Sequence, residues 1–528
     1  MKIMNAIKKL TTAFMAIIMC LSLVACNGLP SGNEGVNSNS GSEDDYDNGG
    51  TVVEVKFWRS GMGVEYFEEM VQNFNRKQSK WNVKYTASAN SESLMSTMGL
   101  EAVDTTDLYL VGAVSDMTYL EPLTEMLNAT ADGDSKPLKE KFDQFYLKTE
   151  TSRDGNIYTL TTGGGTISLV YNSRLFKEAG IDVVPRTTDE LVAACEKLKK
   201  ADITPFIHFS GGGYWLHFAE VWACQYDGFD YYLNNFYGCV DENGVSPSKK
   251  VFTAKDGRYA MLKDLSKIIT PENVEAGSSS IDHITAQTMF LNADIGMMIN
   301  GAWMSNEMKS TGKMDDFAVM KTPVVSGIKD KLTTIKSDVE LRKLISAIDA
   351  VTDGTKDISE YKSGDNYLVE GKEISTADWD YVYDARNTVA TAYTGQSAVV
   401  PKYSAEKEGA IEFLKYYYSD EGMQIYAKHT HMLMPIELSN GEIDRSDWNM
   451  FENTVSDAFE QSKYQIGKQM RCKHDIFLRG GADGYPGANY IVEFSTHNEV
   501  DRKTADEVWN NIQKAVNDKY DSWLANMK

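Results

Sequence analysis

The sequence predicts a mixed α/β protein with a mostly parallel sheet. Residues 51–58 (TVVEVKFW) alternate in polarity and are rich in β-branched side chains, which is typical of a strand. Apolar residues at helical spacing follow in residues 63–78, and residues 81–88 (WNVKYTAS) again have the character of a strand. A strand, a helix and a second strand in this order form a βαβ unit, whose two strands run parallel.

The same succession of strands and helices continues along the chain. Thr187 and Glu190 are spaced as a capping box, which predicts that a helix begins there. Thr504 and Glu507 have the same spacing and predict the start of the last long helix. We therefore expect helices on both faces of the sheet. Further strands are expected at residues 107–113 (DLYLVGA) and 166–172 (TISLVYN).

The first 50 residues predict export and attachment to a membrane by lipid. Residues 1–25 begin with lysines and continue as a short apolar run, which is typical of a secretory signal peptide. The run ends in Leu-Val-Ala-Cys26, which resembles a bacterial lipobox, whose cysteine is acylated and becomes the mature N-terminus. Residues 26–50 would then be the lipidated cysteine and a flexible linker. An ordinary secretion signal with an incidental cysteine is the alternative.

Composition and charge limit the classes of partner. Hydrophobic residues make up 42% of the chain and aromatic residues 11%, enough for folded cores. The formal net charge of −23 argues against nucleic acid and against anionic lipid surfaces as partners. Cys224 and Cys239 are candidates for a disulfide in an oxidising exterior, but free thiols are equally compatible with the sequence.

Motifs for enzymes, metals and cofactors do not fit the chain. Ser210 is not in a Gly-x-Ser-x-Gly motif, because residue 208 is histidine. The histidines of residues 429–431 (HTH) lack the spacing and the acidic partner of a zinc motif. None of the 76 acidic residues is singled out as a glycosidase pair. We expect no catalytic residues, no metal and no cofactor.

Four segments carry a resemblance to a known family, namely 154–160 (DGNIYTL), 169–198 (LVYNSRLFKEAGIDVVPRTTDELVAACEKL), 286–308 (AQTMFLNADIGMMINGAWMSNEM) and 398–427 (AVVPKYSAEKEGAIEFLKYYYSDEGMQIYA). In this order they resemble the family 1 extracellular solute-binding proteins, the maltose-binding-protein-like carbohydrate receptors of ABC importers. The resemblance covers most of residues 51–528, although an insert at about 328–395 exceeds the simplest members. It implies a monomeric binding protein that captures a carbohydrate, with an oligosaccharide favoured, and delivers it to the permease subunits of an importer.

The resemblance also implies a type II periplasmic-binding-protein-like fold, with two α/β lobes and a ligand cleft between them. By this mapping, residues 51–166 and 325–418 form the first lobe, and residues 167–324 and 419–528 form the second. The expected location is the extracellular face of the cell membrane, which is the periplasmic side if the source has an outer membrane.

Aromatic residues at strand ends and in glycine-rich loops are the candidate ligand contacts. Sugar rings present flat C–H faces and a rim of hydroxyl groups, so they are bound by aromatic faces with polar side chains at the edges. Tryptophans on helical apolar stripes, namely Trp222, Trp509 and Trp523, are instead predicted to lie in the core. The candidates, at places where the resemblance implies cleft residues, are Trp58 with its neighbour Arg59, Tyr214, Trp215, Trp303 and Tyr485.

Two other functions stay open on the sequence alone. One is a binding protein for a different solute, such as a peptide or a chelated metal. The other is an anchored glycan-degrading enzyme.

Overall fold

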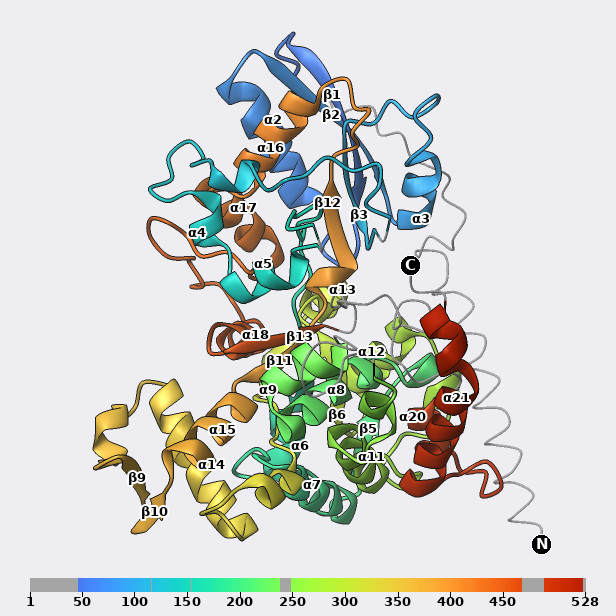
Figure 1. Cartoon of the computed structure of the whole chain (residues 1–528), viewed down its shortest axis with the longest axis vertical. Coiled ribbons are helices and arrows are strands. Elements are labelled where there is room, and N and C mark those ends of the chain that lie inside the picture. The colour runs from blue at the N-terminus through green and yellow to red at the C-terminus, as the bar shows by residue number, and fades with distance from the viewer. Residues whose placement is uncertain (1–45, 115, 153, 238–247, 468–488, 526–528) are drawn as a thin grey trace, which may run out of the picture.

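The computed structural model describes residues 46–114, 116–152, 154–237, 248–467 and 489–525. The chain folds into two α/β lobes, one above the other in Figure 1, each built on its own main sheet. This confirms the predicted mixed α/β class and the two-lobed arrangement. Cys26, Cys239 and Tyr485 lie outside the described residues. In the part of the chain that is described, no helix is both long enough and apolar enough to cross a membrane.

The first lobe holds a four-stranded sheet in the order β12-β3-β1-β2. β1 runs parallel to β2 in register from Thr51 opposite Trp81 to Trp58 opposite Ser88, and it also runs parallel to β3. The predicted βαβ unit is therefore confirmed, and its helix α2 buries the apolar stripe expected from the sequence. The strands are β1 (Thr51–Trp58), β2 (Trp81–Ser88), β3 (Leu108–Gly112) and antiparallel β12 (Gln396–Val399). The helices are α2 (Glu65–Lys77), α3 (Ser91–Leu94), α4 (Leu138–Lys141), α5 (Gln144–Glu150), α16 (Lys407–Tyr417) and α17 (Asp420–Thr430).

The described chain enters the first lobe at the start of β1. The Asn48 side-chain amide donates to the carbonyl oxygens of Gln78, at 2.7 Å, and of Trp81, at 2.8 Å. Asn82 donates its side-chain amide to Asp47 at 2.8 Å. These bonds fix the entering segment to the end of α2 and the beginning of β2.

The second lobe holds a sheet in the order β13-β11-β4-β6-β5, with β7 also paired to β4. Its strands are β4 (Thr166–Asn172), β5 (Thr204–Ile207), β6 (Ile295–Gly301), β7 (Phe317–Met320), β11 (Thr388–Thr391) and β13 (Tyr464–Gly467). Its main helices are α6 (Ser173–Glu178), α7 (Thr188–Lys200), α8 (Trp215–Asp227), α11 (Gly257–Ile268), α12 (His283–Asn292), α13 (Met304–Met308), α18 (Met450–Glu460), α20 (Tyr490–Ser495) and α21 (Ala505–Ala525).

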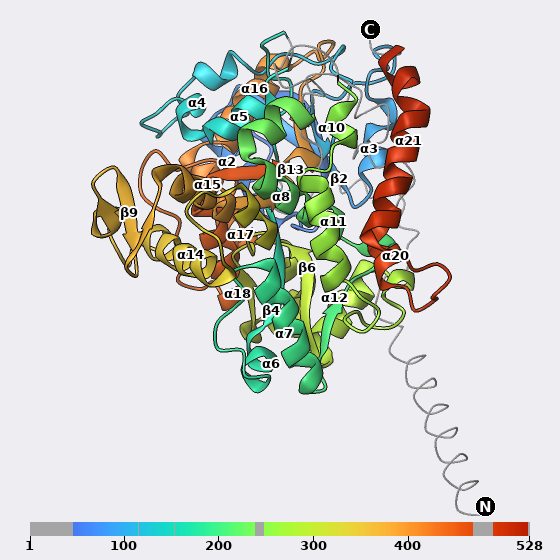
Figure 2. The ribbon, with the colours of Figure 1, turned by 60° about the horizontal axis from the view of Figure 1, so that its bottom comes forward.

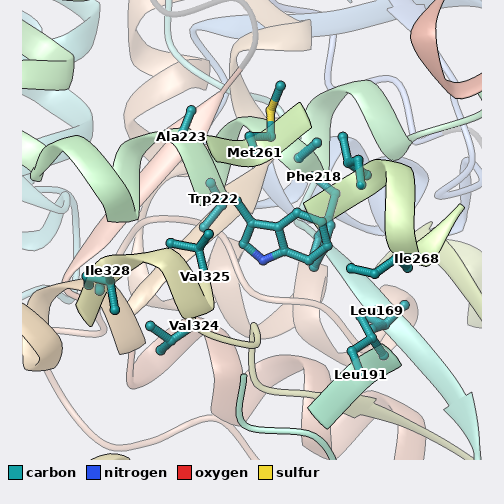
Figure 3. Close-up of a cluster of buried hydrophobic side chains, with 14 of the residues drawn as sticks. Leu169, Leu191, Phe218, Trp222, Ala223, Met261, Ile268, Val324, Val325 and Ile328 are labelled. Atoms are coloured by element: carbon teal, nitrogen blue, oxygen red, sulfur yellow. The ribbon is translucent and has the colours of Figure 1, made fainter. Parts of the chain in front are cut away.

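Tryptophan and aliphatic side chains fill the core of the second lobe. Trp222 is fully buried and lies at the centre of Figure 3, and its indole N–H donates to the Pro323 carbonyl oxygen at 3.0 Å. Trp509 is also buried, as predicted, and its helix α21 packs along α11 (Figure 2). Thr187 accepts from the Glu190 backbone N–H at the start of α7, which confirms the predicted helix start.

The structure moves two of the predicted lobe boundaries. Residues 325–391 were assigned to the first lobe, but β11 pairs with β4 and β13 in the sheet of the second. The helices of the insert, α14 (Asp338–Thr352) and α15 (Thr376–Arg386), bury their apolar stripes in the same core as Trp222. An apolar stripe of this kind must be covered, and α15 packs on both α14 and α8 of the second lobe.

The second boundary moves in the opposite direction. Residues from 419 onward were assigned to the second lobe, but α17 packs on α2 of the first lobe. The chain crosses to the second lobe between Asn440, which still bonds to Asp420 and Gly133 of the first lobe, and α18, which packs on β7. The small sheet of the insert, β8 (Lys362–Ser363), β9 (Asn366–Val369) and β10 (Lys372–Ile374), lies at the outer end of the second lobe (Figure 1).

Candidate functional site

The carboxyl ends of the parallel strands of the two sheets meet where the lobes touch. β1 ends at Trp58 in the first lobe, and β6 ends at Gly301 in the second. The loop after β1 reaches the helix after β6, since a Cβ atom at Gly61 would lie 3.1 Å from the Trp303 ring and 2.9 Å from a Glu307 carboxylate oxygen. Open α/β sheets bind ligands outside the carboxyl ends of their strands, so this junction is the candidate site.

A glycine run carries the chain between the lobes beside this junction. Gly163 and Gly164 have φ angles of 154° and 101°, which residues other than glycine rarely adopt. A Cβ atom at Gly165 would lie 2.6 Å from that of Ala302, so the strand β4 can approach β6 this closely only with glycine there. The hydroxyl of Tyr417 donates to the Thr162 carbonyl oxygen at 2.7 Å and fixes the first-lobe side of the crossing.

Trp303 is the central aromatic residue of the junction. It caps the short helix α13, is partly exposed, and packs against both large apolar clusters of the molecule. Its ring lies directly over Gly301, where an added Cβ atom would be 2.3 Å from two ring carbons. The ring of Tyr214 meets it edge to face, with centroids 5.5 Å apart. Phe209 meets Tyr214 in the same way at 5.2 Å.

A carboxylate and a neutral hydroxyl border these rings. Burial raises the pKa of Tyr214 to about 12, and the charge of Glu307 acts in the same direction. Burial also raises the pKa of Glu307, while the hydrogen bond from the Gln287 amide, at 2.7 Å, opposes this shift. Tyr214 therefore keeps its proton near neutral pH and can donate, and a charged Glu307 can accept. This chemistry suits a polar ligand that has both hydroxyl groups and apolar faces.

The sequence profile of one protein family spans this junction and most of both lobes. The family model of the bacterial extracellular solute-binding proteins matches residues 62–424. The chain belongs to this family. Since the family and its structural neighbours are binding proteins and not enzymes, the prediction that the chain is not an enzyme is confirmed.

Relatives of this solute-binding protein include sugar receptors. The arabinooligosaccharide-binding protein of Bacillus subtilis (strain 168) is 25% identical over 214 residues, which are 38% of this chain and 44% of that protein. A solved chitin oligosaccharide binding protein superposes with a TM-score of 0.57 at 13% identity, over 89% of this chain and 98% of the other. The bacterial solute receptor AcbH, whose reported preference is for β-D-galactopyranose, gives 0.56 at 14% identity, over 90% and 99%. The last two comparisons show the two-lobed fold.

The structure brings some of the predicted contacts of the solute-binding protein together and separates others. Trp303 and Tyr214 touch at the junction, as described above. Trp58 and Arg59 lie at the end of β1, both partly buried, and the Trp58 indole N–H donates to the Ala89 carbonyl oxygen at 3.0 Å. Tyr485 lies outside the described residues.

Trp215 requires a correction. It was predicted to contact ligand, but its side chain is 0% exposed and packs against Phe206 and Trp222 in the second-lobe core. It is the first residue of α8, whose inward face it shares with Trp222. The neighbouring Tyr214 faces the junction instead.

Sequence reasoning missed Gly61, Phe209 and Glu307. Glu307 lies four residues after Trp303, so helical spacing alone would place it on the same face. Gly61 and Phe209 gave no local signal, because their roles depend on contacts between distant segments. Cys195 and Cys224 are buried free thiols. Among the described residues, no group of three or more histidines, cysteines and acids could hold a metal ion.

A hollow lies away from the junction, in the first lobe. Its volume is about 790 Å³, and its lining includes Trp81, Ile411 and Tyr416. The lysines of this lining are paired with acids, as in Lys407 with Glu121 at 3.4 Å. Its lining presents neither a partly exposed aromatic pair like Trp303 and Tyr214 nor the strand ends of the junction. We therefore place the candidate site at the junction.

Proposed function

We propose that this solute-binding protein captures a carbohydrate, with an oligosaccharide as its ligand, and delivers it to the permease subunits of an ABC importer. The observation that carries the proposal is the edge-to-face pair of Trp303 and Tyr214 at the meeting strand ends, with Glu307 beside it. The names of the relatives support it, because receptors for arabinooligosaccharides and for chitin oligosaccharides are among them.

The chemistry of the junction favours a neutral sugar. An aromatic face stacks on the C–H face of a pyranose, while the Tyr214 hydroxyl and the Glu307 carboxylate complement its hydroxyl groups. The net charge of −23 and the carboxylate at the junction both disfavour an anionic ligand. A chelated metal would be better served by arginines or paired tyrosines than by this tryptophan.

A panel of neutral glycans tests the proposal. At 100 times its dissociation constant, a ligand should stabilise the folded protein by about 2.7 kcal/mol, measured as a shift in thermal unfolding. We expect the shift with a neutral oligosaccharide at roughly micromolar affinity, and chromatography should return the glycan unchanged. Galactose serves as the monosaccharide comparison. A shift with peptides and with none of the glycans would contradict the proposal.

We further propose that Cys26 carries lipid and holds the receptor at the extracellular face of the cell membrane. The lipobox-like residues before it support this, and buried acyl chains contribute about 0.8 kcal/mol per methylene to membrane binding. The variant Cys26→Ser should appear in the medium or remain as an unprocessed precursor. If it stays in the salt-washed membrane fraction at the wild-type level, the anchor lies elsewhere.

A further inference from the structure

A histidine in an unusual backbone conformation connects the two lobes. His431 follows α17 and has φ of 51°, in the left-handed region that few residues other than glycine adopt. Its Nδ1 atom lies 2.8 Å from an oxygen of Glu452, in the first turn of α18. Its Nε2 atom lies 3.5 Å from Asp447. The end of a first-lobe helix is thus bound to the start of a second-lobe helix.

Glu452 connects this histidine to the helix that carries the aromatic site. Its side chain is 6% exposed and accepts from the Ser305 hydroxyl, two residues after Trp303. It also accepts from the Asn449 backbone N–H at 2.8 Å, as part of a capping box. In addition, Asn306 of α13 donates its amide to the Thr430 carbonyl oxygen at 2.7 Å. Two neighbouring contacts therefore link α13 to the start of α18 and to the end of α17.

The groups that face His431 favour its protonated form. The hydrogen bond to Glu452 raises the pKa of His431 above its usual 6.5, burial opposes this, and Asp447 raises it further. Lys309, after α13, is the cation that lowers it. Trp448 stacks on the imidazole at 5.5 Å, and Arg445 lies 5.3 Å from the centre of the Trp448 ring.

Arg445 is itself bound to the α18 carboxylates of Asp457 and Glu460. Burial alone would raise the pKa of Glu452, but donation from His431 and Ser305 brings it below its usual range.

We propose that protonated His431, acting through Glu452, is a positioning residue that holds α13 and therefore Trp303 in place. The attraction is complete while the imidazole is charged and is lost as the pH rises through the folded-state pKa of His431. The position of Trp303 should accordingly change between mildly acidic and mildly alkaline solution. The consequence for ligand affinity rests on the proposed function, but the effect on Trp303 does not.

Fluorine NMR of protein labelled with 5-fluorotryptophan tests this without any sugar. The chain has nine tryptophans, and the variants Trp303→Phe and Trp448→Phe assign the two resonances that matter. In the wild type, both resonances should titrate with one shared midpoint above pH 6.5. In His431→Gln, the Trp303 resonance should become independent of pH. In the matched control His429→Gln, whose imidazole contacts Glu69 of α2, both titrations should persist.

Two other histidines lie near the aromatic site and provide the decisive comparison. His283 is 6.1 Å from Phe209 and His217 is 6.2 Å from Tyr214, between ring centroids. If the Trp303 titration survives in His431→Gln and disappears in His283→Gln or His217→Gln, the proposal is overturned. It is equally overturned if Trp448 titrates in the wild type and Trp303 does not.

The charge of Glu452 can be tested separately. Glu452→Gln keeps the shape of the side chain and should lower the midpoint of the Trp448 titration, because the imidazolium loses its partner. Once a glycan ligand is known, the affinity of the wild type for this glycan should fall at least about fivefold from pH 6 to pH 8. The affinity of His431→Gln for the same glycan should not change over this range. The fluorine measurement needs no sugar, so a failure of the proposed sugar binding can be distinguished from a failure of the proposed role of His431.

Discussion

Replacing Trp303 by alanine is expected to weaken oligosaccharide binding by at least about 2 kcal/mol, roughly thirtyfold. The ring is partly exposed at the meeting strand ends and touches Tyr214, so it offers a sugar an aromatic face to stack on. Because the ring also packs on Gly301 and against both cores, some folding stability should be lost as well. Calorimetric titration and urea unfolding of the same variant measure the two effects.

A second substitution moves the same ring without removing it. Gly301→Ala would place a Cβ atom 2.3–2.4 Å from three carbons of the Trp303 ring, which must then shift. The affinity of Gly301→Ala for the oligosaccharide should therefore fall, as we expect for Trp303→Ala. Gly327→Ala is the matched control, since its Cβ atom would make an ordinary 3.4 Å contact with Tyr226. A loss of folding stability of about 3–5 kcal/mol in the Trp303 variant, with affinity unchanged, would identify Trp303 as a core residue.

Replacing Trp215 by alanine should have the opposite profile. The side chain is 0% exposed and is surrounded by Phe206, Phe218 and Trp222, so the variant should lose about 3–5 kcal/mol of folding free energy. Molecules that remain folded should bind ligand normally. Trp215→Phe, which keeps much of the volume, should lose less. If Trp215→Ala unfolds at the same urea concentration as the wild type but no longer binds the ligand, Trp215 belongs to the binding site and not to the core.

The contrast between Trp215 and its neighbour Tyr214 shows what local sequence can and cannot determine. Both follow three glycines, which predicted an exposed loop, and both were placed at the cleft. Trp215, Phe218 and Trp222 nevertheless repeat at helical spacing, and α8 buries that stripe. This periodicity is present in the sequence, but the three glycines before it predict a loop, so the position at which the helix begins could not be determined. Adjacent residues at a helix start face different directions, so only one of the two reaches the junction.

The predicted strands and the βαβ unit were confirmed because they depend on local alternation and on a single connection. The lobe boundaries were not, because they depend on which sheet an added strand joins. β11 is short, and nothing in its four residues distinguishes the edge of one sheet from the edge of the other. Gly61 joins the site for a similar reason, because it lies 242 residues before Trp303 in the chain and meets that ring only through the packing of distant segments. Helical spacing places Glu307 beside Trp303, but no local pattern predicts that either residue contacts Gly61.

If the receptor is attached through Cys26 as proposed, the bonds that Asn48 makes at the start of β1 determine where the first lobe is held. They lie at the opposite end of β1 from Trp58, and eight strand residues separate the two by about 26 Å. The proposed attachment would therefore hold the first lobe by the end of β1 that is opposite the junction. In that attachment the first lobe is the one held at the membrane, and the second lobe, which carries Trp303, is connected to the membrane only through the first.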